Sequence, residues 1–136
     1  AAAAPSAASS APASRALRVL VADDNIDAAN SLCALLQLAG HITSVAHDGE
    51  EAVRLARELR PQVAFLDIGM PRLDGYGAAR AIRALPDLDA VRLVALTGWG
   101  AADDRRRSRE AGFDAHLLKP AAPEEVQAQL AREGRD

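Results

Sequence analysis

The run VAFLD at residues 63–67 decides the fold. Four apolar residues in succession are typical of a strand that is covered on both faces, and the run closes on one carboxylate, Asp67. The same arrangement recurs in RVLVA before Asp23 and Asp24, in LVAL before Thr97 and in HLL before Lys119. Parallel strands that end in polar residues form one ligand-binding crevice at their carboxyl ends. The sequence therefore predicts that three carboxylates, a hydroxyl and an ammonium meet at one edge of a sheet.

Amphipathic stretches separate the apolar runs, and this alternation predicts repeated βα units. We expect strands at 18–23, 42–46, 63–67, 92–96 and 115–118. We expect helices at 26–39, 48–59, about 72–85, about 101–111 and from 123 onward. These elements make a doubly wound α/β fold with a five-stranded parallel sheet and five helices. In the order 2-1-3-4-5, right-handed crossovers place the first strand beside the third, so their terminal acids face one another.

Length and composition indicate one domain preceded by a tail. The chain has 136 residues, a net charge of -3 and a pI near 5.6, so a nucleic-acid footprint is not expected. Cys33 is the only cysteine and lies in the apolar run LCALL, which predicts a small core residue in a reducing, cytoplasmic setting. No apolar stretch approaches the roughly 20 residues of a membrane span, so we expect no membrane contact.

The first 15 residues, AAAAPSAASSAPASR, contain only Ala, Pro and Ser before Arg15. Such a segment has no large apolar side chains to bury, which predicts a disordered linker at 1–15 and a folded domain at 16–136. A start in a linker without Met indicates a piece of a longer polypeptide.

The three predicted site acids, Asp23, Asp24 and Asp67, need a counterion. Two carboxylates about 4 Å apart repel by roughly 4 kcal/mol at an effective dielectric near 20. Mg²⁺ is the fitting cation because it takes oxygen ligands and commonly uses one or two carboxylates plus waters and substrate phosphate. The backbone carbonyl of Gly69 is a further candidate ligand.

Asp67 is the candidate nucleophile because it ends the central strand, and a carboxylate on such a site can form an aspartyl phosphate. Phosphoryl transfer spreads charge over three oxygens, so the protein mainly positions and neutralises the group. Lys119 would supply positive charge and Thr97 a hydrogen bond. Lys119 is the only lysine among otherwise arginine-rich basic residues, which indicates a place for a compact ammonium.

The segments RVLVADDN, VAFLDIGMPRLDGY, LVALTG and HLLKP together resemble the receiver domain of two-component response regulators, over about residues 17–133. The resemblance implies a flavodoxin-like fold and Mg²⁺-dependent phosphoryl transfer from a phosphohistidine to Asp67. It implies metal binding at Asp23 and Asp24 and phosphoryl contacts at Thr97 and Lys119.

The same resemblance implies partners. These are the dimerisation and phosphotransfer domain of a histidine kinase or a histidine phosphotransfer protein. A homodimer through the fourth helix, fifth strand and fifth helix is a further expectation. The stretch ALTGWGAADDRRRSREAGFDAHLLKP looks most like receivers at the C-terminus of hybrid sensor histidine kinases. A stand-alone regulator stays open.

Two departures from the family pattern bear on switching and on phosphoryl lifetime. His116 stands where the family usually has Tyr or Phe as the aromatic that swings inward after the residue matching Thr97 moves. An imidazole titrates near pH 6.5 and would make that movement pH-sensitive. Gly69 and Trp99 lie where the family tunes lifetime.

Simpler interpretations accompany the site. Asp24 or Asn25 can cap the first helix, and Asp74–Gly75 is typical of a turn. The arginines 105–107 and Arg109 are typical of a solvated helix face. His41 and His47 have no metal-ligand spacing.

Two rival functions remain at this stage. A phosphatase of the haloacid dehalogenase type needs a second Asp two residues after the nucleophile, where this chain has Gly69. A receiver-like interaction module that is not phosphorylated would have lost an aspartate or the lysine. Neither loss occurs here.

Overall fold

A five-stranded parallel sheet with the order β2-β1-β3-β4-β5 forms the centre of the molecule. A computed structural model describes residues 16–88, 90–98 and 104–132. The strands are β1 (Arg18–Ala22), β2 (Ile42–Ala46), β3 (Val63–Asp67), β4 (Arg92–Thr97) and β5 (Ala115–Leu118). The predicted flavodoxin-like order is confirmed, and the bounds of β2, β3 and β5 agree with the predicted ones.

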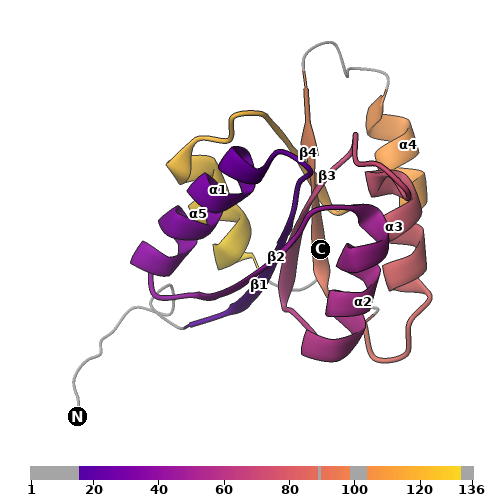
Figure 1. Cartoon of the computed structure of the whole chain (residues 1–136), viewed down its shortest axis with the longest axis horizontal. Helices are drawn as coiled ribbons and strands as arrows, with labels where there is room; N and C mark the ends of the chain where they lie inside the picture. The colour runs from indigo at the N-terminus through magenta and orange to yellow at the C-terminus, as the bar shows by residue number, and fades with distance from the viewer. Residues whose placement is uncertain (1–15, 89, 99–103, 133–136) are drawn as a thin grey trace.

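Helices cover both faces of the sheet (Figure 1). They are α1 (Ile26–Leu38), α2 (Gly49–Leu59), α3 (Gly75–Arg83), α4 (Asp104–Ala111) and α5 (Pro123–Ala131). Helices α1 and α5 lie on one face, and α2, α3 and α4 lie on the other. Among the described residues, no helix combines the length and the apolar character that crossing a membrane requires.

Two separate apolar cores result from the alternation of side chains along the strands. Leu20, Ala64 and Leu66 face the α2–α4 side, whereas Val19, Val21 and Phe65 face the α1–α5 side. Cys33 is buried in the second core as a free thiol, which confirms its predicted place. Because both faces are covered, β1, β3 and β4 carry polar groups mainly at their ends.

Three helices begin at polar caps that the sequence supplies. The side-chain oxygens of Asn25, Asp48 and Asp74 accept the backbone N–H groups of Ala28, Glu51 and Gly77. Asn25, not Asp24, therefore caps α1, which leaves both preceding carboxylates for other contacts. The pair Asp74–Gly75 is a helix start in this structure, and its interpretation as a turn was wrong.

The predicted start of the third helix was also wrong. We expected the helix from about residue 72, but it begins at Gly75 and ends at Arg83. Arg72 has a left-handed backbone with φ of 68°, and Asp74 is extended, so neither can continue a helix. Residues 68–74 instead form a loop between β3 and α3.

Smaller differences occur at other boundaries. Strand β1 ends one residue earlier than predicted, before Asp23, and β4 extends to Thr97. Helix α1 ends at Leu38, and Asp48 caps α2 from outside the helix. The linker at 1–15, the predicted first turn of α4 at 101–103 and Trp99 lie outside the described residues.

The arginines of α4 do not all point freely into solvent. Arg106, Arg107 and Arg109 are exposed, but the guanidinium carbon of Arg107 lies 4.3 Å from the centroid of the buried Tyr76 ring. This cation–π contact links α4 to α3. The predicted solvated face therefore also contributes one packing contact.

Candidate functional site

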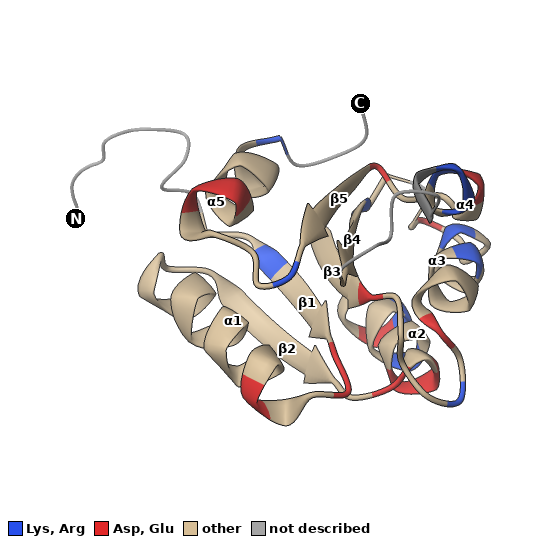
Figure 2. Cartoon of the chain, turned by 90° about the horizontal axis from the view of Figure 1, so that it is seen from above, with Lys and Arg blue, Asp and Glu red and all other residues tan. Residues whose placement is uncertain are grey.

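The carboxyl ends of β1 and β3 bring three acids together. Ala22 is the register partner of Leu66, so the next residues, Asp23 and Asp67, come level with each other. One ligand oxygen from each of Asp23, Asp24 and Asp67 lies within 4.8 Å of the others. Figure 2 shows acidic residues after the tip of β1 and at the end of β3, on the same edge of the sheet.

The backbone fixes the two buried acids. Asp23 donates its N–H to Ala46 O at 3.0 Å, and its Oδ1 accepts the N–H of Asn25 at 2.9 Å. Oδ1 of Asp67 accepts the N–H of Gly69 at 3.2 Å. Asp23 and Asp67 are 2% and 7% exposed, whereas Asp24 is exposed. The pocket therefore has two buried acids, Asp23 and Asp67, at its bottom and one solvent-exposed acid, Asp24.

Lys119 completes the site from the end of β5. Its Nζ lies 3.2 Å from Asp23 Oδ2 and 3.3 Å from Asp67 Oδ2. Its backbone N–H donates to Thr97 O at 2.8 Å, which ties the residue to the neighbouring strand β4. One ammonium thus bridges the acids of two strands.

Burial and charge act against each other in this pocket. Burial raises the pKa of Asp67, and the negative charge of Asp23 raises it further, although the Gly69 N–H and Lys119 act in the opposite direction. Partial burial lowers the pKa of the Lys119 ammonium, but its contacts with Asp23 and Asp67 outweigh burial and leave that pKa raised. Lys119 is therefore held in its charged form.

The remaining predicted residues lie around this centre. Thr97 is buried at the end of β4, one position beyond Leu96, which is the register partner of Asp67. Its Oγ1 lies 3.5 Å from Leu117 O, a weak contact. His116 is half-buried on β5 opposite Ala95. By strand alternation, Thr97 and His116 lie on the sheet face that α2–α4 cover.

The donor set fits a hard divalent cation. Three carboxylates converge, and one lysine offsets only part of their charge. Oxygen donors of this kind suit Mg²⁺. The backbone at Gly69 lies beside Asp67, because its N–H donates to Asp67 Oδ1.

A cleft beside the pocket was not anticipated from the sequence. It has a volume of about 450 Å³, with Asp23 and Lys119 among its lining residues and Leu32 and Leu35 of α1 along a wall. Its signal in the sequence is the composition of α1, IDAANSLCALLQL, which has one charged residue in 13. A helix with so few charges keeps apolar side chains beyond its core-facing stripe.

His41 has a structural role that the sequence analysis did not predict. It is buried, and its Nδ1 accepts the N–H of Leu17 at 3.1 Å. Burial lowers the pKa of this imidazole. The contact is structural and lies at the amino end of β1, away from the acidic pocket.

Fold and pocket together define a class: a doubly wound parallel sheet with an acid-and-lysine pocket at its carboxyl edge. Residues 19–131 match the family model described as response regulator receiver domain. The chain belongs to this family of two-component signalling domains.

Two similar regulatory proteins support the assignment to this family. The transcriptional regulatory protein PrrA of Mycobacterium leprae is 45% identical over 113 residues, covering 83% of this chain and 48% of that protein. A probable transcriptional regulator ycf27 of Guillardia theta is 38% identical over 113 residues, covering 83% of this chain and 43% of that protein. The chain therefore spans about half the length of these relatives.

Among solved structures, the receiver domain of sensor histidine kinase PA1611 from Pseudomonas aeruginosa is similar, with a TM-score of 0.80 and 33% identity. The match covers 88% of this chain and 98% of that one. That crystal structure has a magnesium ion coordinated in its active-site cleft. The chemotaxis protein CheY4 of Vibrio cholerae has a TM-score of 0.81 and 28% identity, covering 88% and 99% of the two chains.

Proposed function

We propose that Asp67 accepts a phosphoryl group from the phosphohistidine of a histidine kinase or a histidine phosphotransfer protein. The observation that carries this proposal is the placement of Lys119 Nζ, 3.2 Å from Asp23 and 3.3 Å from Asp67, inside a cluster of three acids. A phosphoryl acceptor needs a carboxylate nucleophile with fixed positive charge beside it. Asp67 and Lys119 meet that requirement.

Asp23, Asp24, Asp67 and the backbone carbonyl of Gly69 are the proposed Mg²⁺ ligands. When bound, the ion would neutralise charge on the phosphoryl oxygens. The magnesium in the PA1611 receiver domain supports this assignment by similarity. The acidic cluster supports it from this chain's own residues.

In the transfer step, one carboxylate oxygen of Asp67 forms a bond to phosphorus while the phosphorus–nitrogen bond of the donor breaks. The bonding electron pair leaves with the imidazole nitrogen, so an acyl phosphate and a free histidine result. Lys119 faces the oxygens that gain negative charge, and the Thr97 hydroxyl donates a hydrogen bond to one of them. The mainly apolar cleft beside Asp23 and Lys119 is open to solvent and is a candidate contact surface for the donor.

The switch is proposed to run through Thr97 and His116. Both lie on the sheet face that α3 and α4 cover, so a movement of Thr97 toward the phosphoryl group frees space that the imidazole can enter. The affected surface is α4, β5 and α5, which we propose as the partner-binding or homodimer face. His116 stands where the family usually has Tyr or Phe, so its imidazole is the side chain proposed to enter this space.

The proposed setting is the cytoplasm, and residues 1–15 are proposed to be a linker. A hybrid sensor histidine kinase is the proposed context. The relatives named transcriptional regulators are about twice as long as this chain, so a DNA-binding region elsewhere in the whole protein is compatible with the proposal. We assign no nucleic-acid or membrane contact to this domain.

Incubation with acetyl phosphate and Mg²⁺, followed by intact mass measurement, tests the acceptor. We expect one added phosphoryl group on the wild type and none on Asp67→Asn. Asp74→Asn is the matched control because it removes a nearby acid but keeps an N-cap oxygen, and it should be labelled like the wild type.

Equal labelling of the wild type and Asp67→Asn would place the acceptor elsewhere. No labelling of the wild type, by acetyl phosphate or by a phosphorylated histidine donor, would favour the non-phosphorylated interaction module. Steady release of phosphate from a small phosphate ester would favour the phosphatase.

A further inference from the structure

We infer that the amino end of α2 positions the β3–α3 loop, residues 68–74, for the acidic pocket. Gly49 does so by close packing on Leu73, and Asp48 does so by pairing with Arg72. The inference rests on the proposed function, since the loop carries Gly69, whose backbone we assign to the metal site. Gly49, Asp48 and Arg72 are thus positioning residues that act through the loop.

The inner part of the loop is tied to the sheet. Ile68 donates its N–H to Leu96 O at 3.1 Å, and Gly75 donates its N–H to Ile68 O at 2.9 Å, which closes the base of the loop. Gly69 lies between these ties and the outer part. A Cβ at Gly69 would meet nothing within 4 Å, so this position offers no side-chain packing of its own. Its N–H donates to Asp67 Oδ1 on one side, and on the other side the buried Met70 leads to the outer part of the loop.

The outer part of the loop rests on α2. A Cβ at Gly49 would lie 1.8 Å from Leu73 O and 2.6 Å from Leu73 C, so the two backbones touch where only glycine fits. Gly49 is the first residue of α2 and is buried. Leu73 therefore packs against α2, a helix that is not one of the two elements, β3 and α3, that the loop connects.

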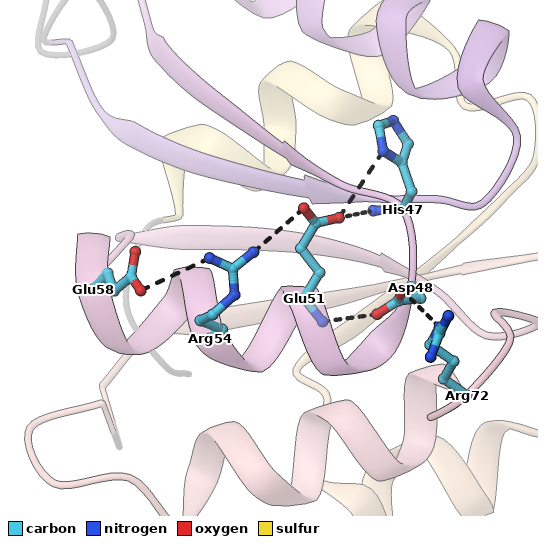
Figure 3. Close-up of polar contacts among 6 residues, drawn as sticks. All are labelled: His47, Asp48, Glu51, Arg54, Glu58 and Arg72. Carbon is cyan, nitrogen blue, oxygen red and sulfur yellow. Dashed lines mark hydrogen bonds and ion pairs between the residues drawn. The ribbon is translucent and has the colours of Figure 1, made fainter.

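An ion pair joins the same two segments. Arg72 Nε lies 3.4 Å from Asp48 Oδ2, and the other Asp48 oxygen accepts the N–H of Glu51 at 2.8 Å (Figure 3). Asp48 thus caps α2 and holds the loop with the same carboxylate. Arg72 has a φ of 68°, a conformation that a residue with a Cβ adopts at a cost and keeps where its surroundings hold it.

The rest of the polar network in Figure 3 supplies a control. Arg54 pairs with Glu51 at 3.5 Å and with Glu58 at 3.9 Å, and these three residues all belong to α2. Their side-chain ion pairs and hydrogen bonds stay on this helix or reach His47, which precedes it. The side chains of Arg54 and Arg72 are 56% and 67% exposed, so the two arginines are similarly exposed, but only Arg72 belongs to the loop.

The experiment compares Arg72→Ala, Asp48→Asn and Gly49→Ala with the control Arg54→Ala. Asp48→Asn keeps a capping oxygen but removes the charge, and Arg72→Lys keeps the charge as a rescue variant. Amide hydrogen exchange over residues 68–74 is measured without Mg²⁺, and the Mg²⁺ dissociation constant is measured by calorimetry.

We expect faster exchange in the loop for the three positioning variants, and a Mg²⁺ dissociation constant raised by up to roughly tenfold. Gly49→Ala should have the largest effect. Labelling by acetyl phosphate at saturating Mg²⁺ should match the wild type for Arg72→Ala and Asp48→Asn. Arg54→Ala and Arg72→Lys should remain close to the wild type in every readout.

Unchanged loop exchange and unchanged Mg²⁺ affinity in Arg72→Ala and Asp48→Asn would overturn the role of the ion pair, even if Gly49→Ala does not fold. A lower melting temperature with faster exchange throughout the domain and an unchanged dissociation constant would show a merely structural role. A wild type that binds no Mg²⁺ and takes no phosphoryl group would overturn the proposed function instead, and the metal-free exchange data would still test the loop contacts.

Discussion

At Asp67, burial and a neighbouring negative charge oppose ionisation, whereas Lys119 and a hydrogen bond favour it. Burial and the neighbouring Asp23 raise its pKa, so the folded state holds a proton on this carboxyl more tightly than the unfolded chain does. Above the unfolded pKa, ionisation of Asp67 therefore costs folding free energy. Lys119 offsets part of this cost. The convergence of acids that would suit a cation therefore lowers the stability of the metal-free domain.

Asp67→Asn is therefore expected to stabilise the domain without Mg²⁺ by about 1 to 2 kcal/mol. Two charges 4.8 Å apart repel by roughly 3.5 kcal/mol at an effective dielectric of 20, and Lys119 cancels part of that. Urea unfolding with and without Mg²⁺ measures the effect, and the stabilisation by Mg²⁺ should shrink in the variant. Glu58→Gln, an exposed acid on α2, should change neither quantity appreciably. A variant less stable than the wild type without metal would contradict the electrostatic account.

The connection between α1 and β2 is the element where stability should depend on pH. His41 sits in this connection, and its neutral Nδ1 accepts the Leu17 N–H at the start of β1. Because burial lowers the folded-state pKa of His41, the unfolded chain takes up a proton first as the pH falls below 6.5. The stabilising effect of the neutral imidazole is complete above that pH and is lost as the pH falls toward the folded-state pKa.

His41→Gln should flatten the fall in unfolding free energy between about pH 7 and pH 5. Chemical unfolding at several pH values gives the slope. His47→Gln replaces an exposed histidine and should keep the slope of the wild type, because His41 is still present. An identical slope in the wild type and His41→Gln would assign the pH dependence to other groups.

Much of the element order could be predicted because covered strands read as continuous apolar runs. The covered run VAFLD was predicted with correct bounds, and polar residues at the strand ends indicated which edge carries the site. The start of α3 could not be predicted in this way. Arg72 and Leu73 fit a helical pattern, but the contact of Leu73 with Gly49, 24 residues earlier in the chain, draws this segment into a loop.

In the candidate site, too, some features could be predicted from the sequence and others could not. Asp23 and Asp67 lie together because strand register brings them level. Lys119 lies two residues beyond Leu117, the β5 residue level with Asp67, and its side chain reaches both acids. The cleft beside α1 and the support of the loop by α2 depend on packing between elements, which periodicity does not encode. Strand register therefore predicts which side chains lie at the strand ends, but it does not predict the cleft or the loop contacts around them.

At the scale of the whole molecule, Arg83 joins elements at the edge opposite the acidic pocket. From the last turn of α3, its guanidinium donates to Gly112 O at 2.9 and 2.7 Å and to Val91 O, and it pairs with Asp114 at 2.7 Å. Asp114 also accepts the N–H of Leu93 at 2.9 Å. One largely but not fully buried side chain thus links α3, the start of β4 and the turn before β5.

Arg83→Leu should destabilise the domain by about 3 kcal/mol, because it leaves the buried Asp114 carboxylate without its cationic partner. Arg80→Leu, an exposed arginine one turn earlier on α3, should cost less than about 0.5 kcal/mol. Thermal or urea unfolding measures both. Mg²⁺ affinity below the unfolding transition should be unchanged in both variants, and a loss of affinity in Arg83→Leu would show that the two edges of the sheet communicate.

The lone lysine has a practical consequence. Within these 136 residues, the acidic pocket holds the sole ε-amine, and it is 30% exposed. Acylation of this one amine would therefore remove the positive charge of Lys119 from the pocket and leave all the guanidinium groups unmodified. Protection of that amine from chemical tagging would in turn report directly on whether the pocket is filled.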